Sequence, residues 1–155
     1  MSSLGDYGSC MRFKELIEDL ISKCPGNPED VEVLLATRRI NGVLMEDPTQ
    51  VWLREIAATE VDEVGLYFVP KLLWTGEPAF RSPVSVAALQ TYATQNPGLA
   101  GFDVFVVDSR GETERGRILS MNLSILGVRV GSKTELWIIQ FPQEQWPESW
   151  FTKPA

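Results

Sequence analysis

Histidine is absent from the 155 residues of this chain. Without an imidazole, the chain lacks the base of a serine or cysteine triad and the ligands of a histidine-bound zinc or copper site. Its two cysteines, Cys10 and Cys24, are too few for a four-thiolate zinc site or for a disulfide framework. We therefore expect no bound metal, no cofactor and a fold that needs no disulfide.

Long apolar runs and phosphate-binding loops are missing as well. No charged-then-apolar leader and no apolar run of about 18 residues occurs, which predicts a cytoplasmic protein that stays out of membranes. The chain contains no GxSxG motif, no GxxxxGK loop followed by Ser or Thr, and no GxGxxG after a strand. Nucleotide binding through a known loop is therefore disfavoured.

Positive charge is scarce in the first part of the chain. The formal net charge is −7, and residues 1–63 carry 13 acids and 6 bases, whereas residues 64–155 carry 8 of each. A negative field of this kind repels nucleic-acid phosphates and attracts a protein with a basic surface. The simpler alternative is a solvated surface that keeps the protein soluble.

The apolar periodicity predicts an α+β fold. We expect an antiparallel sheet, formed by a C-terminal meander, packed against about three to four helices, with a mainly helical N-terminal part. Helices are predicted over 11–24, 28–39, 47–59 and 83–95. A strand remains the alternative for residues 28–40, because the Asn41-Gly42 pair that follows is a strong hairpin signal.

The predicted meander contains short apolar segments in the last third of the chain. Strands are predicted over 64–69, 102–108, 119–125 and 136–141. The alternation shifts phase at Leu126-Gly127, which indicates a bulge or sharp bend. We expect residues 1–10 to form a flexible leader and residues 11–155 a single domain that ends in an aromatic tail over 142–155.

Aromatic residues are concentrated in that tail. Trp146, Trp150 and Phe151 lie among three prolines after the last predicted strand. Exposed aromatic surface of this extent either folds back as a lid on the sheet, which we favour, or docks into a partner. Trp74, in the loop before the last predicted helix, poses the same choice.

Carboxylates are the remaining route to catalysis. Asp108 could converge with Glu112 or Glu114 around a Mg²⁺ ion, although residues 108–111 also match a plain turn, the interpretation that we favour. Arg110, Arg115 and Arg117 give the same hairpin a basic character. They could receive a phosphate or an acidic loop, or be solvated flanks of the hairpin.

We therefore expect a non-enzymatic protein-binding or regulatory protein, of the inhibitor, immunity or adaptor type, that uses an acidic face and aromatic anchors. The expected binding residues are Trp146, Trp150, Phe151, Trp74, Arg110, Arg115 and Arg117. One alternative is a carboxylate enzyme, dependent on Mg²⁺ or not, centred on Asp108, Glu112 and Glu114. A second alternative is a structural subunit of a larger assembly.

Overall fold

A computed structural model describes residues 11–37, 39–40, 43–44, 51–112, 115 and 118–140 of the chain. The predicted leader over 1–10 and the aromatic tail over 142–155, with Trp146, Trp150 and Phe151, lie outside these ranges. Glu114 and Arg117 lie outside them too.

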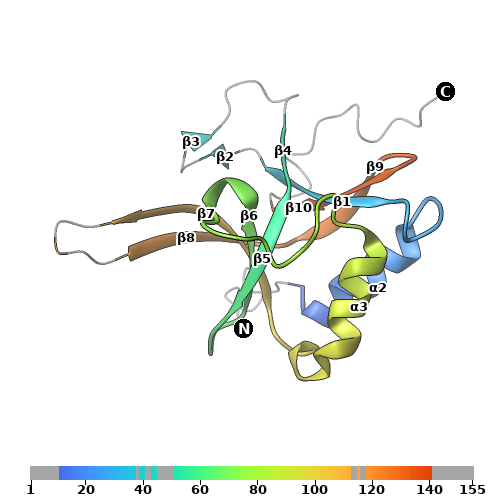
Figure 1. Cartoon of the computed structure of the whole chain (residues 1–155), viewed down its shortest axis with the longest axis horizontal. Coiled ribbons are helices and arrows are strands. Elements are labelled where there is room, and N and C mark those ends of the chain that lie inside the picture. Colours follow the sequence, from blue (N-terminus) through green and yellow to red (C-terminus); the bar gives the residue numbers. More distant parts are fainter. Residues whose placement is uncertain are drawn as a thin grey trace, which may run out of the picture.

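Within these ranges the chain forms two α-helices and two four-stranded sheets (Figure 1). The first sheet has the order β4-β1-β10-β9, with strands Trp52–Arg54, Glu32–Thr37, Glu135–Ile139 and Gly127–Ser132. The second has the order β5-β6-β7-β8, with strands Ile56–Val61, Leu66–Pro70, Val104–Glu112 and Ile118–Ser124. Strands β2 (Arg39–Ile40) and β3 (Val43–Leu44) form a separate antiparallel pair.

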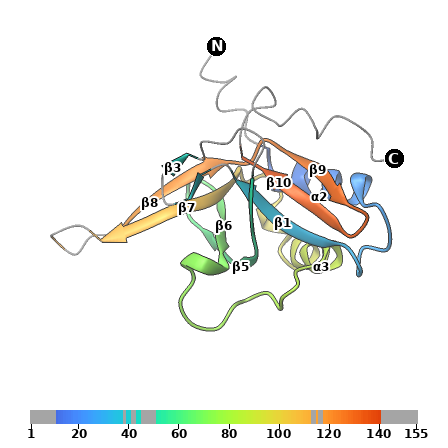
Figure 2. The same cartoon turned by 90° about the horizontal axis from the view of Figure 1, so that it is seen from above.

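The helices α2 (Phe13–Lys23) and α3 (Val86–Gln95) pack against each other at one end of the molecule (Figures 1 and 2). The apolar stripe predicted over 11–24 is confirmed, because it buries Phe13, Leu16, Ile17 and Leu20 of α2. The predicted helix over 83–95 is confirmed with a later start. Its N-cap is Ser85, whose hydroxyl accepts a 3.0 Å hydrogen bond from the Ala88 amide.

The predicted fold class is wrong in two respects. Both sheets are mixed, because β1 runs parallel to β10 and β6 runs parallel to β7, while the other neighbours are antiparallel. The described N-terminal part is not mainly helical. Strand β1 replaces the helix predicted over 28–39, and β4 and β5 replace the one predicted over 47–59.

Local turn chemistry explains the misassigned helix over 28–39. Asn27 accepts hydrogen bonds from the amides of Glu29 and Asp30, so the Asn-Pro signal closes a turn and does not begin a helix. The residues after this turn are apolar on both faces of a central strand, with five buried residues in a row over 33–37. Strand β1 pairs with β10 on one side and with β4 on the other, and these pairings stabilise the strand over the predicted helix.

The predicted C-terminal meander is divided between the two sheets. Strands β7 and β8 form a hairpin of the second sheet, whose far ends project away from the helices in both views (Figures 1 and 2). Strands β9 and β10 form a hairpin of the first sheet. The chain crosses between the sheets at Ile125 and Leu126, whose amides donate to Val104 and Ile139 at 3.1 and 2.8 Å. The phase shift predicted at Leu126-Gly127 marks this crossing.

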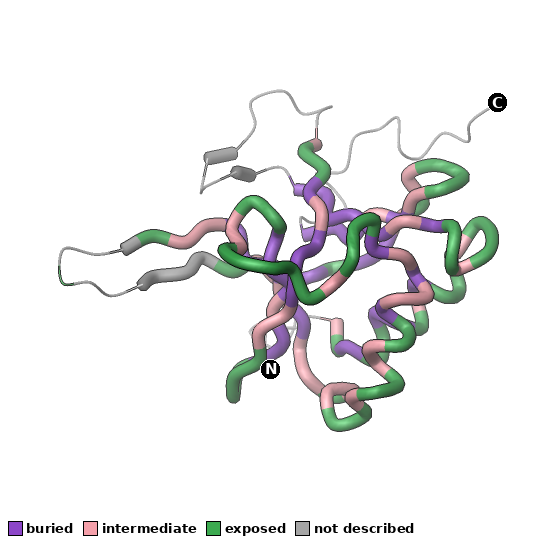
Figure 3. The backbone as a smooth tube through the Cα atoms, viewed as in Figure 1, coloured by how far each residue is buried: buried purple, intermediate pink, exposed green. Residues whose placement is uncertain are grey.

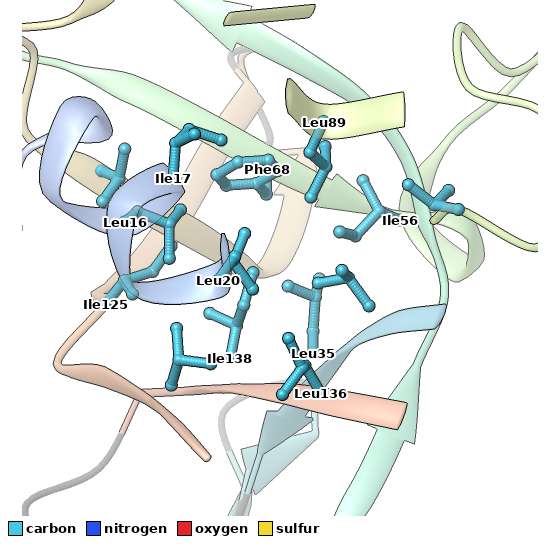
Figure 4. Close-up of a cluster of buried hydrophobic side chains, with 14 of the residues drawn as sticks. Leu16, Ile17, Leu20, Leu35, Ile56, Phe68, Leu89, Ile125, Leu136 and Ile138 are labelled. Carbon is cyan, nitrogen blue, oxygen red and sulfur yellow. The ribbon is translucent and has the colours of Figure 1, made fainter. Parts of the chain in front are cut away.

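One hydrophobic cluster lies between the two sheets and the two helices. It contains Leu16, Ile17 and Leu20 from α2, Leu89 from α3, Leu35, Leu136 and Ile138 from the first sheet, and Phe68 from the second (Figure 4). The buried segments in Figure 3 run through the middle of the strands, and the exposed ones lie mostly in turns and at strand ends. Both sheets therefore have one face against the same core.

A buried ion pair joins the two sheets. Arg54, at the end of β4, places Nη2 3.6 Å from the Asp108 carboxylate, and its Nη1 donates to the Asp108 carbonyl at 3.3 Å. Asp108 lies at a β-bulge of β7, between Val107 and Ser109. The side chains are 6% and 1% exposed, so each charge depends on the other for compensation.

Removing one member of this pair should destabilise the fold. We expect Asp108→Asn to lower the free energy of unfolding by about 3–5 kcal/mol, because it removes a negative charge that faces the buried Arg54 guanidinium. The double variant Arg54→Met/Asp108→Asn should lose less than the sum of the two single changes. Urea denaturation measures all three.

The control is Asp19→Asn, which breaks the exposed Lys23–Asp19 pair and should cost less than about 1 kcal/mol. A loss for Asp108→Asn as small as that of the control would contradict the role given to the buried pair.

Candidate functional site

Each sheet has an outer face, turned away from the shared core. On β10, Leu136 and Ile138 belong to the core, so Trp137 between them points to the outer side. On β7, Val104 and Val106 belong to the core, and Phe105 points outward in the same way. The two outer faces carry acidic and aromatic side chains that the core does not use.

Trp137 is held in place on the outer face of the first sheet. A Cβ atom on Gly131 would collide with the Trp137 indole, so the ring lies directly over this glycine of the neighbouring strand β9. The indole Nε1 donates a 3.2 Å hydrogen bond to a carboxylate oxygen of Glu135. The half-buried ring is therefore held in one position by Gly131 and Glu135.

Glu135 belongs to a group of three carboxylates, and Arg129 on β9 is the cation directly opposite Trp137. Glu32 on β1 lies directly opposite Glu135 on β10, and Glu55 follows the neighbouring strand β4. Loss of solvent and then the charges of Glu55 and Glu135 raise the pKa of Glu32. Lys71 offsets part of this charge, with its Nζ 3.7 Å from a Glu55 oxygen. Like charges opposite each other on a sheet are destabilising, so the requirements of folding alone do not explain this group.

The same outer face becomes apolar beyond Trp137. Ala36 and Ile139 lie side by side on β1 and β10, both 0% exposed, with Val51 and Trp137 packed against them. Leu53, opposite Ala36 on β4, is 41% exposed. The outer face of the first sheet is thus acidic at one end, while at the other end Ala36 and Ile139 are buried and Leu53 is exposed.

The outer face of the second sheet carries a stacked aromatic pair. A row across the strands places Glu60, Tyr67, Phe105 and Ser124 next to one another. The rings of Tyr67 and Phe105 stack with centroids 5.3 Å apart and planes 22° apart. A Cβ on Gly65 would collide with the Phe105 ring, so this ring too lies over a glycine.

Asp62 fixes the other side of this pair. Its carboxylate accepts hydrogen bonds from the Tyr67 hydroxyl at 3.0 Å and from the amides of Val64 and Gly65 at 2.8 and 3.0 Å. Loss of solvent raises the pKa of Asp62, but these hydrogen bonds outweigh it and lower the pKa overall. Loss of solvent, followed by the bond to Asp62, raises the pKa of Tyr67. Near neutral pH the carboxylate is therefore charged and the phenol neutral.

The structure places Asp108, the centre of the alternative enzyme hypothesis, in the interior beside Arg54. Residues 108–111 lie within strand β7, so the turn that we favoured for them is wrong. The Glu112 side chain and Glu114 lie outside the described residues. Among the described side chains, no three carboxylates or thiols are arranged to hold a metal ion.

The predicted binding residues that the structure describes are Trp74, Arg110 and Arg115. Arg110 is brought to Glu60, with which it makes two contacts, the longer of 3.3 Å. Trp74 is half-buried and donates from Nε1 to the Glu77 carbonyl at 3.0 Å, within its own loop. Arg115 is exposed at the end of the β7–β8 hairpin.

The residues of the outer faces were not among the predicted binding residues. Trp137 had a usable signal, because it alternates with the core residues Leu136 and Ile138. The pairing of Tyr67 with Phe105 had none, because it depends on the parallel register of β6 and β7.

No helix in the described part of the chain is long and apolar enough to span a bilayer. Comparison of the chain with protein-family models, with curated proteins and with solved structures gave no match. Function is therefore inferred from the chain's own residues.

Neutralising Glu32 should stabilise the protein near neutral pH. Because the folded-state pKa of Glu32 is raised, its ionised form carries a penalty above that pKa, and the penalty fades as pH falls below it. Glu32→Gln should melt at a higher temperature than the wild type at about pH 7. The gain should shrink toward zero below the ordinary glutamate pKa of about 4.3. Calorimetry across pH, with the exposed Glu63→Gln as control, tests this, and a lower melting temperature for Glu32→Gln at about pH 7 would contradict it.

Asp62 should show the opposite behaviour. Its lowered folded-state pKa means that the ionised form contributes stability above the unfolded pKa of about 3.9, and this contribution is lost as pH falls through the lower folded value. Asp62→Asn should therefore melt below the wild type at about pH 7 and approach it in strong acid. A pH-independent difference in the same calorimetric series would show that charge is not the cause.

Proposed function

We propose that the protein is a non-enzymatic, regulatory binding protein of the inhibitor, immunity or adaptor type, which recognises another protein through a basic surface on that partner. The observation that carries this proposal is the group of three carboxylates, Glu32, Glu55 and Glu135, of which Glu135 accepts a hydrogen bond from the indole of Trp137. We further propose that it acts in the reducing cytoplasm that its cysteine content favours.

A basic partner complements this surface electrostatically. Loss of solvent raises the pKa of Glu32 most, and the charges of Glu55 and Glu135 raise it further, so the three carboxylates repel one another in the free protein. Lysine or arginine side chains placed over Glu32 and Glu135 would offset that repulsion. The relief of the repulsion would favour binding. The net charge of −7 would also speed the encounter with a positively charged protein.

Trp137 fits the role of an anchor. Tryptophan is among the residues that contribute most to protein interfaces. Its position over Gly131 and its bond to Glu135 lower the conformational entropy that an interface would otherwise have to overcome. The aromatic anchors predicted in the tail, Trp146, Trp150 and Phe151, remain predictions.

The test compares three immobilised proteins in extracts of the cells that produce this chain. They are the wild type, Glu32→Gln/Glu135→Gln, and the control Glu18→Gln/Glu77→Gln, which changes the net charge equally at two exposed positions. We expect a basic protein, identified by quantitative mass spectrometry, to be retained by the wild type and the control. The Glu32/Glu135 variant should retain about tenfold less of it, equivalent to about 1.4 kcal/mol.

Thermal melting verifies that all three proteins are folded. If no protein distinguishes the Glu32/Glu135 variant from the matched control, the carboxylate group is a solvated surface and the proposed function is wrong. If Trp137→Leu retains the same protein at the wild-type level, the indole is not an anchor of the interface.

A further inference from the structure

The outer face of the second sheet carries a second surface, the aromatic platform, formed by Tyr67, Phe105, Gly65 and Asp62. Both rings are half-buried, and the opposite sides of their strands already supply Phe68, Val104 and Val106 to the core. The exposed apolar residues Val61 and Val64, at 47% and 63%, flank the same turn as Asp62. Packing of the core therefore does not account for the platform.

Every part of the platform is held by an observed contact. Phe105 lies over Gly65, Tyr67 stacks on Phe105, and Asp62 binds the Tyr67 hydroxyl together with two amides of the turn. A ligand that stacks on these rings would cause only a small loss of side-chain conformational entropy. Rigid aromatic surfaces of this kind bind with a low entropic cost.

The charges around the platform are mainly negative. Asp62 borders the Tyr67 ring, Glu63 beside it is exposed, and Asp103 precedes Phe105 by two residues on the same side of β7. The nearby cations are Arg110, engaged by the carboxylate of Glu60, and Arg12, which pairs with Asp103 in a β-bridge. A positive group approaching the rings therefore meets the carboxylate of Asp62 beside the Tyr67 ring.

We propose that the aromatic platform binds an arginine side chain of a protein partner. A guanidinium is planar, stacks on an aromatic face as a cation–π contact and donates to carboxylates at its edge, whereas the compact lysine ammonium does not stack. A nucleobase would also stack, but its phosphates would be repelled by the local carboxylates.

This inference goes beyond the proposed function, because the platform lies on the other sheet from Trp137 and its carboxylates. The two can fail separately. Tyr67→Leu removes the platform and leaves Glu32 and Glu135 unchanged, and Glu32→Gln/Glu135→Gln does the reverse.

The first experiment varies the ligand and leaves the protein intact. Capped tripeptides Gly-Arg-Gly, Gly-Lys-Gly and Gly-citrulline-Gly are titrated into isotope-labelled protein, and the ring signals of Tyr67 and Phe105 are followed by NMR. We expect the arginine peptide to shift both rings and to bind about two- to fivefold more tightly than the lysine peptide, the ratio that a cation–π contact of about 0.5–1 kcal/mol gives. Citrulline, which keeps the shape without the charge, should cause no saturable shift.

The second experiment varies the protein. Tyr67→Leu should lose about fivefold in affinity for the arginine peptide, and Tyr67→Phe, which keeps the ring and loses the bond to Asp62, should lose less. Trp137→Leu is the matched control on the other sheet and should bind the peptide at the platform as the wild type does. Melting curves confirm that each variant is folded.

Several results would overturn the proposal. Ring signals that do not move with arginine, or that move equally with citrulline, exclude recognition of the guanidinium. Equal affinity for arginine and lysine peptides would leave only nonspecific charge attraction. Ring signals that change with protein concentration alone, and cease to do so in Tyr67→Leu, would show that a second copy of this chain occupies the platform instead.

Discussion

The constraint on which the rest of the structure depends is that two mixed sheets share one core through only one face each. Side chains alternate along a strand, so a core made by Leu136, Ile138, Val104 and Val106 forces the residues between them outward. The chain crosses from one sheet to the other at Glu55 and again at Ile125–Leu126, which keeps both inner faces on the same cluster. The outward side chains include the acids and aromatic rings, although Leu34, Ala36 and Ile139 on the outer face of the first sheet are themselves buried.

The same division separates charges that are compensated from charges that are not. Between the sheets, Arg54 and Asp108 neutralise each other, as a buried pair must. On the outer face of the first sheet, Glu32 and Glu135 face each other across neighbouring strands, with Glu55 close enough to act on Glu32. Such repulsion lowers the stability of the fold. Binding of a basic partner would relieve it.

Part of this organisation was accessible from the sequence and part was not. The stripe of α2 and the apolar runs of β6, β7 and β10 are local patterns, and they were predicted near their observed positions. The helices predicted over 28–39 and 47–59 failed because pairing with distant strands outweighed local helix signals. The platform depends on the parallel register that places Tyr67 beside Phe105, and the carboxylate group on the register that places Glu32 beside Glu135. No local pattern encodes contacts between residues so far apart in the chain.

The central claim is that this protein acts by contact through its outer sheet faces, and hydroxyl-radical footprinting of the protein with its captured partner tests it most directly. Binding should protect Trp137 on the first sheet, with Tyr67 and Phe105 on the second as the further surface. Ile21, an exposed apolar residue that lies on α2 and on neither sheet, should be oxidised as in the free protein. Protection confined to Ile21, with Trp137 unchanged, would contradict the account.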